Sequence, residues 1–207
     1  MVSFKKIKLW VLLVLSVGII VNICLIRLGQ SYPLDVRPTE IGKPLIHQTE
    51  NTLICSEISS IVATESYVYL LYKDADVVQV YRSDGAYLAT IAIYDPYENG
   101  SYKITLLENE IVLTDKIGNI YIFMGTKMTA FYEKENVPGV IKQQSTPENT
   151  QYFIRKSSVV TQEESGISVF VHRPNWLIIY QNNFLYFLQF ALVATIGLLA
   201  MKWAKRT

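Results

Sequence analysis

The residues that could bind a metal or perform catalysis are few and scattered in this 207-residue chain. Its two histidines, His47 and His172, have no second ligand at the spacing of a metal site. Asp74 and Asp76 form a D-x-D pair, but a strand-like stretch follows where a calcium loop would need further oxygen ligands. The P-loop, dinucleotide-binding and serine-hydrolase signatures are also absent from the sequence. We therefore expect no metal, no cofactor and no catalytic residue.

Two uncharged polar residues stand out because each interrupts a long apolar run. Asn22 lies within residues 9–26 and Gln189 within residues 184–201, and neither run contains a charged residue. A helix of either length covers about 27 Å, close to the thickness of the hydrocarbon core of a bilayer. The alternative, that both are core helices of a soluble protein, would normally leave a polar face on each. We predict two membrane-spanning helices.

The two amides lie at nearly the same predicted depth, because Asn22 is four residues and Gln189 five residues from the outer end of its run. We predict a hydrogen bond between them, since neither amide would have a partner if it faced lipid. In the alternative arrangement each amide reaches the outer headgroups or its own helix backbone. Small residues on which a neighbouring helix could pack are Ala191, Ala194, Gly197 and Ala200.

Basic residues at both ends of the chain predict its orientation. Those outside the two apolar runs are Lys5, Lys6, Lys8, Lys202, Lys205 and Arg206. Because basic flanks stay cytoplasmic, we expect both termini inside a plasma membrane and residues 27–183 outside it. "KKIK" followed by residues 16–18 also resembles a cleavable signal peptide, but the apolar run continues to residue 26, which favours an uncleaved signal anchor.

The overall composition is more hydrophobic than that of a purely soluble protein. Hydrophobic residues make up 50% of the chain and charged residues only 18%, below the roughly 25% of an average soluble domain. The net charge of +1 creates no field that would favour nucleic acid. Cys24 falls in an apolar run and leaves Cys55 without a partner, which excludes a disulfide framework.

The region between the apolar runs contains three copies of one pattern. "VLTDKIGNIYIF", residues 112–123, aligns without gaps on residues 70–81 and on residues 159–170. Apolar positions coincide in all three copies, and the alternation of period two is typical of β-strands. Asp, Asn and Gly residues in the middle of each copy favour tight turns. The pattern predicts a strand, a turn and a second strand in each copy.

Flanking stretches extend each copy to about four strands. Preceding strands are predicted at 61–63, 104–107 and 152–154, and closing strands at "YLATIAI", "MTAFYE" and "WLIIY". The resulting units, at about 59–94, 101–136 and 150–180, have the length of propeller blades. Residues 27–58 are predicted to be a linker, in which only "PLIH" and "TLIC" could pair as short strands.

The stretch "VVQVYRSDGAYLATI", residues 77–91, resembles a hairpin of NHL-type β-propeller repeats. The resemblance implies blade-like sheets and binding of a ligand or partner by loops at the blade ends. Closed propellers have typically 4–8 blades, so three units leave sheet edges exposed. The units could form an open sandwich or partial barrel, two chains could join into six blades, or an exposed edge could dock onto a larger partner.

These observations predict an all-β extracytoplasmic domain of three four-stranded, blade-like repeats in an open or sandwich-like form, flanked by two transmembrane helices. The cytoplasmic ends are residues 1–8 and 202–207, and the β-repeat domain is residues 59–183. We expect a non-catalytic module that binds a protein or ligand, as a homo-oligomer or as an accessory subunit of a larger membrane complex. The alternatives are a sensor that signals to a cytoplasmic partner and an enzyme with an unrecognised site.

Overall fold

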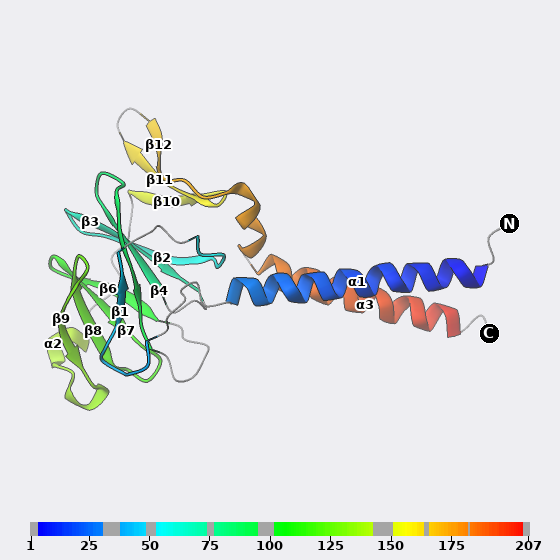
Figure 1. Ribbon diagram of the computed structural model, residues 1–207, viewed down its shortest axis with the longest axis horizontal. Helices are drawn as coiled ribbons and strands as arrows, with labels where there is room; N and C mark the ends of the chain where they lie inside the picture. Colours follow the sequence, from blue (N-terminus) through cyan, green and yellow to red (C-terminus); the bar gives the residue numbers. More distant parts are fainter. Residues whose placement is uncertain are drawn as a thin grey trace.

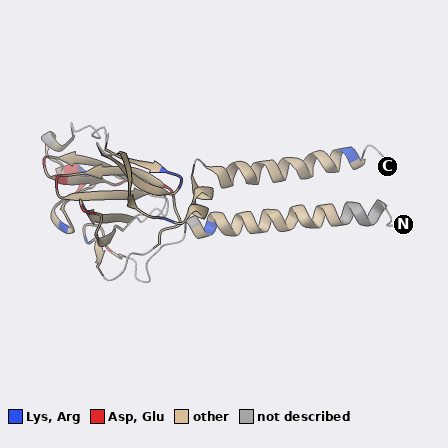
Figure 2. Cartoon of the chain, turned by 90° about the horizontal axis from the view of Figure 1, so that it is seen from above, with Lys and Arg blue, Asp and Glu red and all other residues tan. Residues whose placement is uncertain are grey.

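A computed structural model shows a β-rich lobe from which two long helices project side by side (Figure 1). The structure describes residues 4–30, 38–48, 53–73, 77–94, 102–142, 151–163, 166–181 and 183–204. The helices are α1 (Phe4–Gln30) and α3 (Phe184–Ala204), and each is long and apolar enough to cross a membrane. Figure 2 shows the two helices from above, and the charged residues that it colours on them lie near their ends. Helix α1 extends beyond the predicted boundary at residue 26, because Arg27 does not interrupt helical backbone bonding.

Twelve strands form three separate antiparallel sheets, none of them closed into a barrel. The first sheet has the order β1-β5-β4-β3-β2, the second β6-β7-β8-β9 and the third β10-β11-β12. Their bounds are β1 Leu45–His47, β2 Ile58–Ala63, β3 Tyr67–Tyr72, β4 Val77–Arg82, β5 Tyr87–Ala92, β6 Lys103–Leu107, β7 Glu110–Thr114, β8 Ile120–Met124, β9 Lys127–Tyr132, β10 Tyr152–Arg155, β11 Ser158–Glu163 and β12 Gly166–Val171.

The first sheet is the central layer of the lobe, buried on both faces. One face shares a core with the second sheet, and this core includes Tyr69, Tyr121 and Phe123. The opposite face shares a core with the third sheet, through residues such as Tyr72 and Val159. This double burial explains why β3 and β4 consist largely of apolar and aromatic residues instead of alternating with polar ones. Figure 1 shows the third, first and second sheets stacked in that order.

The first and second sheets approach each other closely at Gly125. Its amide donates a hydrogen bond to Tyr69 Oη at 2.8 Å. Gly125 has a φ of +60°, and a Cβ atom there would lie 2.9 Å from Cζ of Tyr67. Only glycine combines this left-handed conformation with so little space. The outer face of the second sheet is covered by the segment after β9, which contains a 3₁₀ helix (Lys134–Asn136) and α2 (Gly139–Lys142).

The sequence-based prediction of a fourth strand in the third unit is wrong. The stretch "WLIIY" lies in a 3₁₀ helix, η2 (Asn175–Tyr180), which begins after Pro174. The amide of Leu177 donates to the Pro174 carbonyl at 3.1 Å, and the Leu177 side chain is buried while Trp176 and Ile178 are exposed. The turn therefore directs the chain towards α3 instead of back along β12.

The stretches "PLIH" and "TLIC", which could have paired as short strands, do not pair with each other among the described residues. Residues 45–47 form β1, which pairs with β5 at the edge of the first sheet through Leu45–Ala92, Ile46–Ile91 and His47–Thr90. Residues 53–55 form no strand. The open edge of β5 gives β1 a row of backbone partners that a two-stranded ribbon would not match, since such a ribbon is marginally stable alone.

Candidate functional site

The structure brings the two predicted intramembrane amides together. Asn22 Nδ2 donates hydrogen bonds to Gln189 Oε1 and to the Leu185 carbonyl, both at 2.9 Å. The Asn22 side chain is only 2% exposed, whereas Val21 and Ile23 on either side of it are exposed. The pair lies at the contact between α1 and α3, in the half nearer the lobe. One asparagine thus holds α3 through both a side chain and the backbone.

The helix seam does not use the predicted small residues of α3. Ala191, Ala194, Gly197 and Ala200 are all exposed, and a Cβ atom on Gly197 would meet nothing within 4 Å. The buried and half-buried positions of α3 instead follow a spacing of three and four residues, Leu185, Gln189, Leu192, Ile196 and Leu199. On α1 the close approach is at Gly18, where a Cβ atom would lie 3.7 Å from Leu192. Leucine packing and the amide pair, not a small-residue stripe, determine which face of α3 meets α1.

A short thiol-specific bridging reagent should join Asn22→Cys to Gln189→Cys in full-length protein that carries Cys24→Ser and Cys55→Ser. The expected result is a single intramolecular product, detected by its changed mobility and by mass spectrometry, because the two side chains meet at 2.9 Å. Phe190 is 75% exposed, so the matched pair Asn22→Cys with Phe190→Cys should give little product. Equal yields from the two pairs would contradict the seam.

Arg173 is a buried cation at the point where the third sheet meets the first. Its side chain is 5% exposed, and Nη2 donates to the carbonyls of Ile54 at 2.6 Å and Ser56 at 3.1 Å. The guanidinium carbon lies 5.1 Å from the ring centroid of Tyr72. Carbonyl dipoles and the aromatic face thus replace water around the charge. This arrangement ties the chain after β12 to the segment that leads into β2.

A hydrogen-bonded group of tyrosines continues from Arg173 into the first sheet. Tyr72 Oη donates to Gln79 Oε1 at 2.6 Å, and Tyr81 Oη donates to the same atom at 3.1 Å. Burial raises the pKa of Tyr72 to about 12, although the positive charge of Arg173 opposes this rise. Tyr72 is therefore protonated and remains a donor at physiological pH. Gln79, only 2% exposed, has its carbonyl oxygen satisfied by two tyrosines.

A cleft lies at the junction between the lobe and the two helices. Ile26, Phe184 and Leu185 contribute apolar side chains from the helix ends, and Lys73 and Tyr180 line it from the lobe. Lys73 Nζ donates to Asn183 Oδ1 at 2.9 Å. The backbone of Lys73 is fixed separately, because its amide donates to the Glu57 carbonyl at 2.8 Å and its carbonyl accepts from Ser56 Oγ. The cleft combines apolar helix ends with positioned hydrogen-bond donors.

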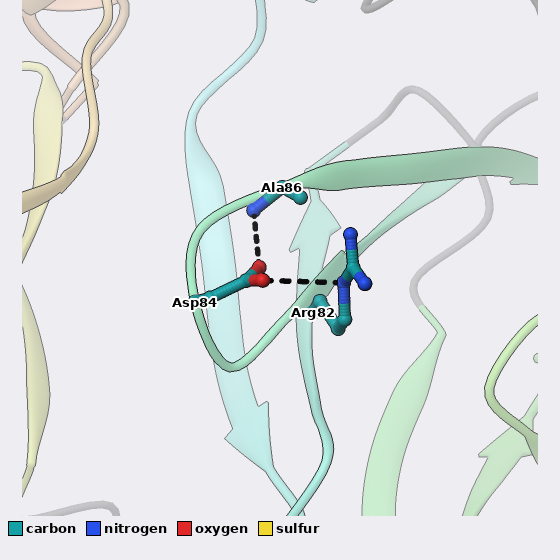
Figure 3. Close-up of polar contacts among 3 residues, drawn as sticks. All are labelled: Arg82, Asp84 and Ala86. Atoms are coloured by element: carbon teal, nitrogen blue, oxygen red, sulfur yellow. Dashed lines mark hydrogen bonds and ion pairs between the residues drawn. The ribbon is translucent and has the colours of Figure 1, made fainter.

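The "RSDG" hairpin of the predicted blade is present as a turn between β4 and β5. The Ala86 amide donates to Asp84 Oδ1 at 3.0 Å, and Asp84 Oδ2 lies 3.4 Å from Arg82 Nε (Figure 3). Gly85 has a φ of +88°, and a Cβ atom there would lie 3.3 Å from the Phe170 carbonyl. The turn thus packs against β12. Its ion pair is exposed, so it stabilises the turn by less than about 1 kcal/mol.

The residues predicted to be poor candidates for metal binding lie apart or outside the described part of the chain. It contains no group of three or more His, Cys, Asp or Glu residues that could hold a metal ion. His47 lies on β1, and His172 is exposed after β12. Asp74 and Asp76 lie outside the described residues. Burial raises the pKa of the Cys55 thiol, with partial opposition from the Arg173 charge, so the thiol is less reactive than a free cysteine.

The sequence interpretation missed Arg173 and Lys73. Each follows the end of a strand, where a basic residue is ordinarily solvated, and nothing in "VHRPN" or "LLYKD" distinguishes it from other turn residues. Only its three-dimensional environment distinguishes Arg173 from other basic residues in turns. No family model, characterised protein or solved structure matches the chain.

Proposed function

We propose that this protein is a non-catalytic assembly module of the plasma membrane, whose third sheet binds a strand of a partner protein. Both termini are cytoplasmic, and residues 27–183 are extracytoplasmic. The observation that carries the proposal is that β12 is an edge strand with exposed apolar side chains. It ends the third sheet, and its apolar residues Ile167 and Val169 are 53% and 61% exposed. Within the described part of the chain no strand pairs with its outer edge.

Strand addition suits this edge because the backbone supplies affinity and the alternating side chains supply specificity. A long edge strand with exposed apolar residues is normally avoided or covered in soluble proteins. The "WLIIY" stretch, which would have been the fourth strand of this unit, is folded into η2 and does not pair with β12. Arg173 fixes the chain after β12 to the segment before β2, and the Lys73–Asn183 hydrogen bond joins the lobe to the residue before α3. These contacts would hold the β12 edge at a fixed height above the bilayer.

We further propose that the three sheets are blade-like repeats in an open array. In support of this, β3–β4, β7–β8 and β11–β12 are equivalent hairpins at the sequence offsets of 42 and 47 residues that align the motif. Consecutive propeller blades are neighbours in space, whereas here the first sheet separates the second from the third. The array is therefore open, and partner binding at β12 covers the edge that ring closure would otherwise protect.

Val169→Asp should abolish co-purification of a stoichiometric partner with the full-length protein from mild detergent. A buried carboxylate at the paired edge would be desolvated without a counter-ion, which we expect to weaken binding at least 100-fold. Met124, also exposed and apolar but on the second sheet, provides the matched control Met124→Asp, which should leave the complex intact. A complex that survives Val169→Asp but not Met124→Asp would contradict the assignment.

Cysteine labelling in intact cells tests the orientation of the chain. Lys127, exposed on β9, can be replaced by cysteine in a chain that carries Cys24→Ser and Cys55→Ser. A membrane-impermeant maleimide should label this cysteine in intact cells, whereas Lys202→Cys at the far end of α3 should react only after permeabilisation. Labelling in the opposite order would reject the topology.

A further inference from the structure

We propose that the junction cleft is a binding site for a glycerophospholipid of the leaflet that faces the lobe, with the phosphodiester at Lys73 and one acyl chain along the apolar helix ends. This inference rests on the proposed insertion of α1 and α3 in a membrane. It assigns to the cleft a ligand class that the assembly role does not require.

The position of the cleft favours a lipid over a soluble ligand. Its apolar lining comes from the lobe-side ends of the two candidate membrane helices, Ile26 on α1 and Phe184 and Leu185 on α3. Its polar lining comes from the lobe, at Lys73 and Tyr180. Apolar and polar walls therefore meet at the depth where acyl chains give way to headgroups in a bilayer. An amphipathic lipid matches both walls.

The polar wall presents two hydrogen-bond donors that suit phosphate and ester oxygens. Among the described residues Lys73 Nζ has the neutral Asn183 Oδ1 as its partner and no carboxylate. Tyr180 Oη is shielded from solvent and has no hydrogen-bond partner there. Burial raises the pKa of Tyr180, so its hydroxyl is protonated and available as a donor. An ammonium group and a phenol that line one cleft favour an anionic, oxygen-rich group.

The charge of the cleft indicates a single phosphodiester. Glu57 also lines the cleft, so its lining includes one acidic and one basic side chain. A lipid with one phosphate thus fits better than a highly anionic headgroup. The backbone bonds of Lys73 to Glu57 and Ser56 hold the start of its side chain independently of any ligand. The site is therefore preorganised, which reduces the entropy lost on binding.

Native mass spectrometry of the full chain tests the site. The protein is first reconstituted in nanodiscs of phosphatidylethanolamine and phosphatidylglycerol, and is then released into mild detergent. We expect one retained phospholipid per chain, a drop of at least fivefold in the bound fraction for Lys73→Ala, a smaller drop for Tyr180→Phe and retention by Lys73→Arg. Lys103→Ala, an exposed lysine on β6, and Tyr132→Phe on β9 are matched controls that should bind like the wild type.

Wild-type lipid occupancy in Lys73→Ala would overturn the proposal, provided that this variant keeps the wild-type circular dichroism spectrum. A parallel sample receives inorganic phosphate at about 10 mM, enough to occupy an anion site with a dissociation constant in the millimolar range. A bound mass equal to phosphate instead of lipid would show that the site binds a free ion, and would also overturn the proposal. Carbonate extraction of membranes from cells that express the protein distinguishes a wrong lipid site from a wrong membrane assignment. A wild-type chain released by carbonate would reject membrane insertion itself, whereas a retained chain without bound lipid would reject only the lipid site.

Discussion

Replacing Arg173 with methionine should lower the free energy of unfolding by about 3 kcal/mol, because two charge-assisted hydrogen bonds are lost and their buried acceptors have no replacement donor. Those acceptors are the carbonyls of Ile54 and Ser56, which lie before β2, while Arg173 follows β12. Methionine has a similar length and keeps apolar contact with Tyr72, so the loss isolates the guanidinium. Lysine should restore only part of the stability, since it cannot supply the planar fork that stacks on the ring.

Hydrogen exchange of the full chain in detergent should locate this effect. Amides of β10, β11, β12 and η2 should exchange faster in Arg173→Met, and those of β6–β9 should keep their wild-type rates, because the second sheet packs on the opposite face of the first. Arg82→Met is the matched control. Arg82 is exposed and its ion pair with Asp84 contributes less than about 1 kcal/mol, so this change should leave exchange in the third sheet unaltered. Equal effects of the two substitutions would contradict the structural role of Arg173.

Replacing Phe123 with alanine should have the largest effect of all, a loss of about 3–5 kcal/mol, as is typical for a large buried aromatic residue. Phe123 is fully buried in the core that the first and second sheets share. The cavity would remove packing from both sheets together. Amides of β7 and β8 in the second sheet should therefore lose protection from hydrogen exchange. Amides of β3 and β4 should lose it as well, although these strands belong to the first sheet.

The matched control for this cavity is Phe153→Ala. Phe153 lies on β10 at the edge of the third sheet and is only half-buried, so its truncation should cost about 1 kcal/mol or less, below the range for a buried phenylalanine. Denaturant unfolding of the full chain, followed with exchange measured sheet by sheet, distinguishes the two. Loss of protection confined to β6–β9 in Phe123→Ala would show that the sheets unfold as independent units. That result would contradict a core shared by the first and second sheets.

Local patterns in the sequence were sufficient for the two long helices and for the strands of the three hairpins. Uncharged runs of 18 residues indicated both helices, and alternating apolar residues indicated the strands of the three hairpins. These signals work because helix and strand periodicity depend on residues within a few positions of one another. The depth argument that paired Asn22 with Gln189 also needed only the lengths of two helices, and the structure places these side chains 2.9 Å apart.

Tertiary structure decided the features that join the elements. Arg173 contacts the Ile54 carbonyl across 119 residues of sequence, and the order in which the sheets stack follows from which faces share a core. It also directed "WLIIY" into η2, where bonding around Pro174 and burial of Leu177 outweigh the strand preference of β-branched residues. By itself the sequence determined two apolar helices around a β-rich lobe. Only folding decided how the sheets stack, where a cation is buried and which strands lie at the sheet edges, because these depend on contacts between distant residues that no local pattern encodes.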